Sequence, residues 1–325
     1  MRNIAGGIFV IGVAFAVASP AGAQTLPFER TFDADGPARL DVSTIRGKID
    51  ISAGDERRIV VSGGVTIRMG WDVPANAATL ARAVADHPPI ERDGSTIRLR
   101  PPSGADERRA VTVSYRVRVP RGTSVVSVSD SGATAIRDVT GSVDVRTQSG
   151  AIEVKQVGGA TTISSGSGAV GVEEAAGPLS VTTSSSAITA RGVKHDLKVR
   201  TGSGAVDAAL SGPGRIDVET ESSGVRLTGA RGALSVTTGG GRVIVDGAPG
   251  GAWKTSTGSG SVEMSLASAP LTIDAKSGSG SVTLQGGSVH GTVSKQRIDG
   301  TVDGGGPRVT IESRSGSIRL ALARR

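Results

Sequence analysis

Five acidic side chains are the residues of this sequence best suited to acid–base chemistry on a sugar. They are Glu153, Glu173, Asp207, Glu219 and Glu263. Cleavage of a polysaccharide needs two carboxylates, or an arginine with an acid, that converge in a groove. These five stand among small residues without a long loop to build a cleft, and Trp71 and Trp253 are the only tryptophans that could stack on a sugar. A polysaccharide lyase or glycosidase is therefore the alternative function of this chain.

The serines and the glycine-rich segments favour bends over catalysis. Gly-Ser-Gly triplets occur at 166–168, 202–204 and 258–260, but a nucleophile elbow has the form Gly-x-Ser-x-Gly between a strand and a helix, with histidine and acid partners. Residues 247–255 look superficially like a phosphate-binding loop, yet Trp253 stands where that pattern requires glycine before the lysine. We predict no catalytic residue and no cofactor.

Metal binding is also disfavoured by the residue types. The histidines His87, His195 and His290 are far apart in the sequence and the chain has no cysteine, so a zinc site lacks its usual ligands. Asp299 and residues 303–306 lack the repeated Gly-Gly-x-Gly-x-Asp pattern of calcium-loaded coils. We predict no metal site, although this reasoning leaves a single adventitious calcium ion open.

A short repeated sequence motif must position most of these side chains. It consists of Ser or Thr, any residue, Ser or Gly, Gly or Ser, and then an alternating apolar run. Its leading residue falls at Ser129, Thr147, Ser165, Thr183, Thr201, Thr220, Thr238, Thr257, Ser277 and Ser313. The steps are 18, 18, 18, 18, 19, 18, 19, 20 and 36 residues. A fixed period of this size indicates a stacked architecture with one supersecondary unit per turn.

Each period holds two short strands and two bends, which predicts an all-β parallel β-solenoid, a single-stranded β-helix, of about ten short coils. Parallel strands ~4.8 Å apart would make a rod of roughly 50 Å. The composition agrees, because 48 glycines suit the bends and seven aromatic residues suit a thin core of small apolar side chains. The last step of 36 residues predicts an irregular or looped-out coil between Ser277 and Ser313.

The alternation of apolar and polar residues along each strand predicts which side chains face the core. One apolar column comprises Val145, Ile163, Val181, Val199, Val218 and Val236, and the other comprises Ile152, Val170, Ile188, Val206, Val225 and Val243. The Ser/Thr column is predicted to lie on the core side of a bend and to bond backbone groups there. The outward residues beside it form a possible binding face, which includes Arg146, Thr182, Arg200, Glu219 and Thr237.

The chain divides into three predicted parts. Residues 1–23 have the basic start, apolar stretch and Ala-Gly-Ala cleavage site of a secretory signal peptide. Residues 24–122 form an irregular β-rich region with one short helix at about 74–87, where Pro74 suits the first turn. Within this region we expect a strand pair at 59–69 and a polar loop at 101–109. Residues 123–325 form the solenoid.

Several segments together resemble the bacterial putative-adhesin family of exported β-solenoid domains of unknown function. The resemblance starts at residues 115–123, Tyr-Arg-Val-Arg-Val-Pro-Arg-Gly-Thr. It continues in Ser131-Gly132, residues 141–145 and 149–154, and upstream in residues 45–51. These motifs are structural, so the resemblance implies the fold, with adhesion or envelope scaffolding as the expected role and no catalytic residues to carry over.

The sequence therefore predicts a non-enzymatic, exported cell-envelope or surface protein that binds a macromolecule along one solenoid face. Its net charge of +7 is spread along the chain, which weakly favours an anionic envelope glycan; another surface protein is the second possible partner. Nucleic acid is not expected, because basic residues interleaved with aromatics are absent. No segment is long enough to span a membrane, and periplasm, cell surface and secretion all stay open, as does the oligomeric state.

Overall fold

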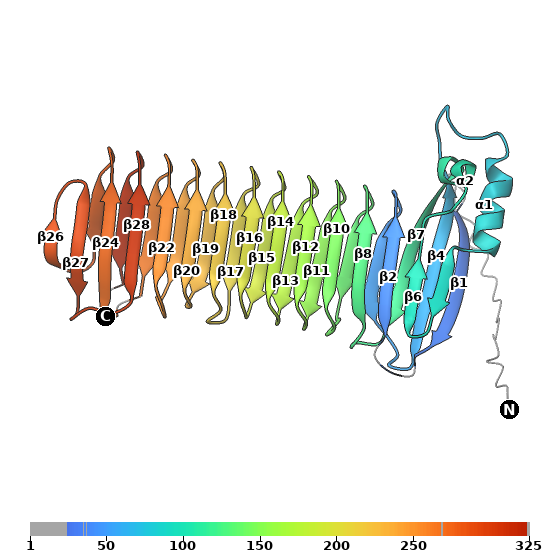
Figure 1. Ribbon diagram of the computed structural model, residues 1–325, viewed down its shortest axis with the longest axis horizontal. Coiled ribbons are helices and arrows are strands. Elements are labelled where there is room, and N and C mark those ends of the chain that lie inside the picture. Colours follow the sequence, from blue (N-terminus) through green and yellow to red (C-terminus); the bar gives the residue numbers. More distant parts are fainter. Residues whose placement is uncertain (1–24, 35, 37, 268, 324–325) are drawn as a thin grey trace.

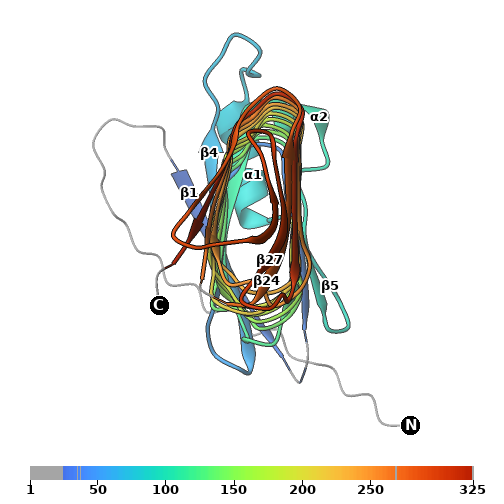
Figure 2. The same cartoon turned by 90° about the vertical axis from the view of Figure 1, so that its left-hand side faces the viewer.

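The computed structural model describes residues 25–34, 36, 38–267 and 269–323. The predicted signal peptide lies outside these residues. The described residues form a long rod built from two sheets that run along its length (Figure 1). Viewed along the axis, the successive coils follow one flattened outline (Figure 2). The predicted fold class, an all-β parallel solenoid, is confirmed.

Each coil contributes one strand to each sheet. β14 (Leu179–Thr183) lies in the 15-stranded sheet, here called sheet B, and β15 (Ile188–Val193) lies in the 14-stranded sheet, here called sheet A. The next coil returns to sheet B as β16 (Leu197–Thr201), which pairs in parallel with β14, with Val181 opposite Val199. The bends from sheet B to sheet A lie along the upper edge of the rod in Figure 1 and are called the upper bends.

The regular part of the stack repeats this unit from β8 to β23. In sheet B its strands are β8 (Ser124–Ser129), β10 (Val143–Thr147), β12 (Thr161–Ser165), β14, β16, β18 (Ile216–Thr220), β20 (Leu234–Thr238) and β22 (Trp253–Thr257). In sheet A they are β9 (Thr134–Arg137), β11 (Ile152–Val157), β13 (Val170–Ala175), β15, β17 (Val206–Leu210), β19 (Val225–Ala230), β21 (Val243–Gly247) and β23 (Val262–Leu266).

Both predicted apolar columns line the interior between the sheets. Val181 and Val199 from sheet B, and Ile188 and Val206 from sheet A, are each at most 2% exposed. Burying each such side chain contributes about 1.5–3 kcal/mol. The core is thus a continuous file of small apolar side chains, which is why the chain needs so few aromatic residues.

The hydroxyl groups of the Ser/Thr column accept hydrogen bonds from backbone amides of the upper bends, as predicted. Thr201 Oγ1 accepts a hydrogen bond from the Gly204 N–H at 3.0 Å, and Thr147 Oγ1 accepts the same bond from Gly150 at 3.0 Å. A Cβ at position 204 would overlap the carbonyl oxygen of Ser186 in the preceding coil. Glycine is therefore required at this bend because successive coils approach so closely, and the buried hydroxyl satisfies its amide.

The N-terminal region continues the stack. β2 (Arg39–Thr44) pairs in parallel with β8, and β3 (Ile49–Ala53) pairs in parallel with β9. β6 (Thr96–Leu99) and β7 (Val111–Val119) lie beyond β2 and β3 and pair with them in parallel. Both sheets therefore continue unbroken across residues 122 and 123, and the division of the chain into domains at that point stays a prediction.

Antiparallel strands and helices close this end of the rod. β4 (Arg58–Ile67) pairs with both β1 (Thr25–Asp33) and β7 (Val111–Val119), while β5 (Ile90–Asp93) and β6 (Thr96–Leu99) form the edge of sheet B. α1 (Ala77–Asp86) packs against β1, β4 and β7. Helix α1 lies within the range predicted for it. Among the described residues, no helix is long and apolar enough to cross a membrane.

Two local expectations for this region are wrong. The predicted loop at 101–109 contains a second helix, α2 (Ala105–Ala110), whose Glu107 side chain accepts the Gly104 N–H at 3.2 Å and caps its start. The predicted strand pair at 59–69 is the single strand β4, because Gly63 lies against the Phe28 ring instead of turning the chain. A six-residue helix has no apolar periodicity to reveal it, and a glycine needed for close packing looks like a turn in sequence.

The C-terminal end departs from sequence order. β24 (Leu271–Ser277) and β25 (Val282–Gln285) form the last coil in space, and the hairpin of β26 (His290–Val293) and β27 (Arg297–Val302) covers it. The chain then turns back as β28 (Arg308–Ser313) and β29 (Ile318–Leu322). β28 lies between β22 and β24, and β29 lies between β23 and β25.

The 36-residue step therefore does not mark two coils in sequence order. The coil that begins near Ser313 is inserted between the coils of Thr257 and Ser277, so Val309 pairs with both Trp253 and Ile273. The irregular segment is the covering hairpin, which allows the chain to reverse before the final coil. Period alone could not reveal this order, because an inserted coil and an appended coil have the same sequence pattern.

Candidate binding face

The five sequence-predicted face residues lie in one row on the outside of sheet B. Arg146, Thr182, Arg200, Glu219 and Thr237 are exposed, and they come from β10, β14, β16, β18 and β20. Strand register aligns them coil by coil, and Ser164 of β12 and Ser256 of β22 continue the same row. Because the sheet is parallel and in register, the row is straight, with one side chain every ~4.8 Å.

The two arginines of this row are already paired within the protein. Arg146 Nη2 lies 2.8 Å from Asp144 Oδ2, and Arg200 Nε lies 3.0 Å from Glu219 Oε2. Exposed ion pairs of this kind contribute little to stability. They fix the orientation of the guanidinium groups and neutralise much of their charge, so the row is not a free basic patch.

A second outward row, two residues earlier in each strand, was missed by the sequence reasoning. It comprises Asp144, Thr162, Ser180, Lys198, Asp217, Ser235 and Lys254. Between β8 and β22 the two rows together carry seven hydroxyl side chains, namely Ser164, Thr182, Thr237, Ser256, Thr162, Ser180 and Ser235. They also carry four basic and three acidic residues. The same strict alternation that located the first row could have located the second.

Sheet A presents a different outer surface. Across the matching strands, β9 to β23, its outward rows carry three hydroxyl side chains, Thr189, Thr228 and Ser265. They carry nine charged residues, namely Arg137, Lys155, Arg191, Arg226, Glu153, Glu173, Asp207, Asp246 and Glu263. The two faces of one rod therefore differ in chemistry, and sheet B is the one rich in hydroxyl groups.

The carboxylates considered for sugar cleavage are tied to basic side chains. Glu153 lies 2.7 Å from Lys155 Nζ and 3.0 Å from Arg137 Nη2, and Glu263 lies 2.6 Å from Arg242 Nη2. Hydrogen bonds from Lys155 and Arg137 lower the pKa of Glu153, and the bond from Arg242 lowers the pKa of Glu263. A general acid needs the opposite shift.

The remaining three carboxylates also have basic partners: Glu173 with Lys155, Asp207 with Arg191, and Glu219 with Arg200. Within the described ranges, no group of three His, Cys, Asp or Glu residues is arranged to hold a metal ion. The outer surfaces of the rod thus offer ordered rows of polar groups, and these five carboxylates are arranged as ion pairs.

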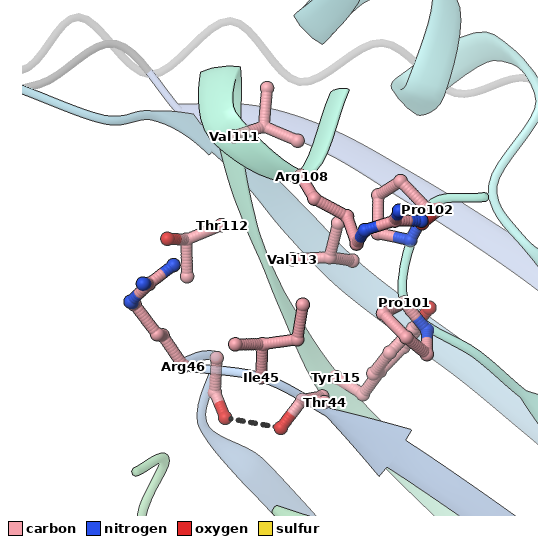
Figure 3. Close-up of a pocket in the computed structure, with 11 residues that line it drawn as sticks. Thr44, Ile45, Arg46, Pro101, Pro102, Arg108, Val111, Thr112, Val113 and Tyr115 are labelled. Carbon is pink, nitrogen blue, oxygen red and sulfur yellow. Dashed lines mark hydrogen bonds between the residues drawn. The ribbon is translucent and has the colours of Figure 1, made fainter. Parts of the chain in front are cut away.

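A small hollow of about 20 Å³, which has room for about one water molecule, lies near the N-terminal end beside the bend at Thr44–Gly47 (Figure 3). Its walls come from Thr44–Gly47, from Pro101 and Pro102, from Arg108 of α2, and from the start of β7. Tyr115 closes its base and donates a hydrogen bond through its hydroxyl to the Arg100 carbonyl at 2.8 Å. Burial raises the pKa of Tyr115. Sequence reasoning missed this hollow, because its walls come from four separate segments.

The fold and its surfaces define a parallel β-solenoid rod, closed at both ends, with polar rows along its length. The chain belongs to the Toastrack DUF4097 family, whose model matches residues 117–321. This confirms the family resemblance inferred from the repeat and from residues 115–123. No curated protein matches the chain.

Two solved structures are among those similar to the chain. A "putative cell adhesion protein" from Clostridium sporogenes is 14% identical, with 91% of this chain and 100% of that chain covered and a TM-score of 0.19. A "putative adhesin" from Bacteroides fragilis is 8% identical, with 91% of this chain and 97% of that chain covered and a TM-score of 0.27.

Proposed function

We propose that this protein is a non-enzymatic cell-envelope or surface protein whose sheet B face binds an anionic envelope glycan. The observation that carries the proposal is the contrast between the two faces. Sheet B aligns seven hydroxyl side chains in two straight rows, whereas the equivalent part of sheet A is dominated by charged residues. Hydroxyl groups both donate and accept hydrogen bonds, as the hydroxyl groups of a glycan do.

Charge adds a modest preference for an acidic polymer. Lys198 and Lys254 are outward residues of sheet B for which no ion pair is found among the described residues, while Arg146 and Arg200 keep donors beyond those used by their carboxylate partners. Arginine has five N–H donors in a planar fork. A rigid row lowers the entropy lost on binding, because the groups are already held in register. Another surface protein remains the second partner to test.

Binding of the full chain to alginate, an acidic polysaccharide, tests the proposal, with neutral dextran as the control polymer. The informative variant is Arg146→Gln/Arg200→Gln on sheet B. Its matched control is Arg137→Gln/Arg191→Gln on sheet A, which removes two other ion-paired arginines. Loss of alginate binding is expected for the sheet B variant alone, together with weakening at high salt.

Two results would contradict this proposal. Equal binding by both double variants would show that sheet B is not the binding face. Shortening of the polysaccharide during incubation, abolished by a substitution such as Glu153→Gln, would show an enzyme instead of a binding protein. A pull-down with isolated surface proteins, carried out with the same four arginine substitutions, tests the alternative partner.

A further inference from the structure

The loop between β4 and α1, residues 68–76, carries the two most exposed large apolar side chains of the described residues. Met69 is 82% and Trp71 is 99% exposed. The loop rises above both helices and beyond the upper edge of the rod in Figure 1, and it projects in the same way in Figure 2. Single apolar residues on a surface are common, but tryptophan is on average a well-buried residue. Two such side chains on one projecting loop indicate contact with an apolar surface outside the molecule.

The β4–α1 loop is fixed to the body of the protein on both sides of these two side chains. Before them, Arg68 Nη1 donates to the Arg109 carbonyl at 2.9 Å and lies 3.5 Å from Asp72 Oδ2. After them, Val73 packs against the hydrophobic core. The apolar side chains are therefore held away from the core, and little order has to be gained when they bind.

The base of the loop is basic. Arg68 contacts the last turn of α2, which contains Arg108 and Arg109. Arg108 and Arg46 line the same small hollow. Arg108 donates only to backbone carbonyls, and neither Arg46 nor Arg108 has a carboxylate partner among the described residues. Two guanidinium groups without a counter-charge thus lie behind the apolar side chains of the loop.

We propose that the β4–α1 loop attaches the rod to an anionic lipid surface. Met69 and Trp71 enter the membrane interface, and Arg46 and Arg108 face the lipid phosphates. Tryptophan suits this position because its ring is apolar and its N–H is polar. Arginine can lay its stem on apolar surface while its charged end stays at the level of the headgroups, and anionic lipids attract basic residues near the surface. The attachment lies at the N-terminal end and leaves the outer face of sheet B free.

A lipid surface fits this loop better than a sugar or a protein. Apart from the indole N–H, Asp72 has the only polar side chain in residues 69–74, and it is paired with Arg68. A sugar stacked on Trp71 would therefore find no free hydrogen-bonding side chain beside it. Met69 and Trp71 bury roughly 400 Å² together, about half of what each partner contributes to a stable protein complex. A lipid interface needs no complementary shape, and shallow, reversible attachment suits so small an apolar area.

Tryptophan emission tests the insertion directly. Trp253 is 1% exposed and residues 1–23 contain no tryptophan, so a change on addition of vesicles reports Trp71. The full chain is titrated with vesicles of phosphatidylglycerol and phosphatidylcholine in equal parts, and with vesicles of phosphatidylcholine alone. Anionic vesicles should shift the emission to the blue, brominated lipids should quench it, and Trp71→Phe should abolish both effects. Neutral vesicles should bind at least about tenfold more weakly.

Two variants separate the apolar and the charged contributions while keeping the tryptophan signal. Met69→Ser should weaken binding to anionic vesicles about tenfold, because one apolar side chain no longer leaves water. Arg46→Gln/Arg108→Gln should weaken it roughly 30-fold, because each basic residue near an anionic surface contributes about fivefold.

The matched controls lie near the C-terminal end of the rod. Val293→Ser replaces another exposed apolar side chain, Arg308→Gln/Arg314→Gln replaces two other exposed arginines, and both should leave vesicle binding unchanged. Equal losses in the control and test variants, an unshifted Trp71, or equal affinity for neutral and anionic vesicles would overturn the proposal. A blue shift with alginate and none with vesicles would also overturn it and would identify a sugar site. The loop is separate from sheet B, so the lipid and glycan proposals can fail independently.

Discussion

Replacing Thr201 with valine tests whether the buried hydroxyl column holds the upper bends. Thr201 is 5% exposed, and its Oγ1 accepts bonds from the Gly204 N–H at 3.0 Å and from the Thr183 hydroxyl at 2.9 Å. Valine has nearly the same shape, so Thr201→Val removes both bonds without creating a cavity. The Thr183 hydroxyl can rotate to another acceptor, whereas the Gly204 amide is held in place by the bend.

The expected loss of stability in Thr201→Val comes from the Gly204 amide, which would no longer have an acceptor. A buried donor without an acceptor costs about 1–3 kcal/mol, and burial of a methyl group in place of the hydroxyl offsets up to about 0.8 kcal/mol. The variant should therefore lose about 1.5 kcal/mol locally, which corresponds to a roughly tenfold drop in hydrogen-exchange protection of the Gly204 amide. Solenoids do not always unfold in two states, so this local measurement is preferable to a global midpoint.

Thr189→Val is the matched control, because Thr189 is exposed on sheet A. It should change stability by no more than about 0.5 kcal/mol and should leave the Gly204 amide protected. If Thr201→Val kept full protection at Gly204, the Ser/Thr column would be a passive consequence of strand alternation and would not hold the upper bends.

Three further predictions follow from other contacts. Arg100 donates hydrogen bonds of 2.9 and 2.8 Å to Asp41 and lowers the pKa of that carboxyl. The ion pair therefore contributes its full stabilisation above the ordinary pKa of 3.8 and loses it as pH falls through the lower pKa of the folded state. Urea midpoints measured from neutral pH to about pH 2 should show this loss for wild type and not for Asp41→Asn, and parallel pH profiles of the two proteins would contradict the prediction. Trp71 is 99% and Trp253 1% exposed, so Trp71→Phe should leave blue-shifted emission that acrylamide quenches poorly, and easy quenching of that variant would refute the placement of Trp253. Removal of residues 308–325 should expose unpaired strand edges at β22 and β24 and cause self-association in light scattering, whereas a stable monomer would show that the two coils can close on each other.

The regular part of this fold could be predicted because the sequence repeat and the spatial repeat of the coils are the same. The spacing that places Val181 one period before Val199 also makes them neighbours in space, so one rule describes strands, core and outward rows together. The same rule placed Arg146 and Thr182 on one face. It could not show that Arg146 is paired with Asp144, because that contact depends on side-chain conformation.

The ends of the rod could not be predicted in this way, since they break the period. The sequence wrongly predicts a turn at Gly63, because the actual role of this residue, close packing against Phe28, depends on a strand distant in sequence. The hollow beside Thr44–Gly47 could not be predicted for a related reason, since its walls come from segments that are far apart in the sequence.

Because the last coil to be synthesised is inserted between two earlier coils, it affects both the order of folding and the position of a C-terminal tag. A ribosome releases the chain from its N-terminus, so β24 and β25 exist before the coil that separates them from β22 and β23. The far tip can therefore take its final position only when translation is nearly complete. The last described strand, β29, lies one coil short of the tip, between β23 and β25, so a tag attached beyond it would be joined to the flank of the rod.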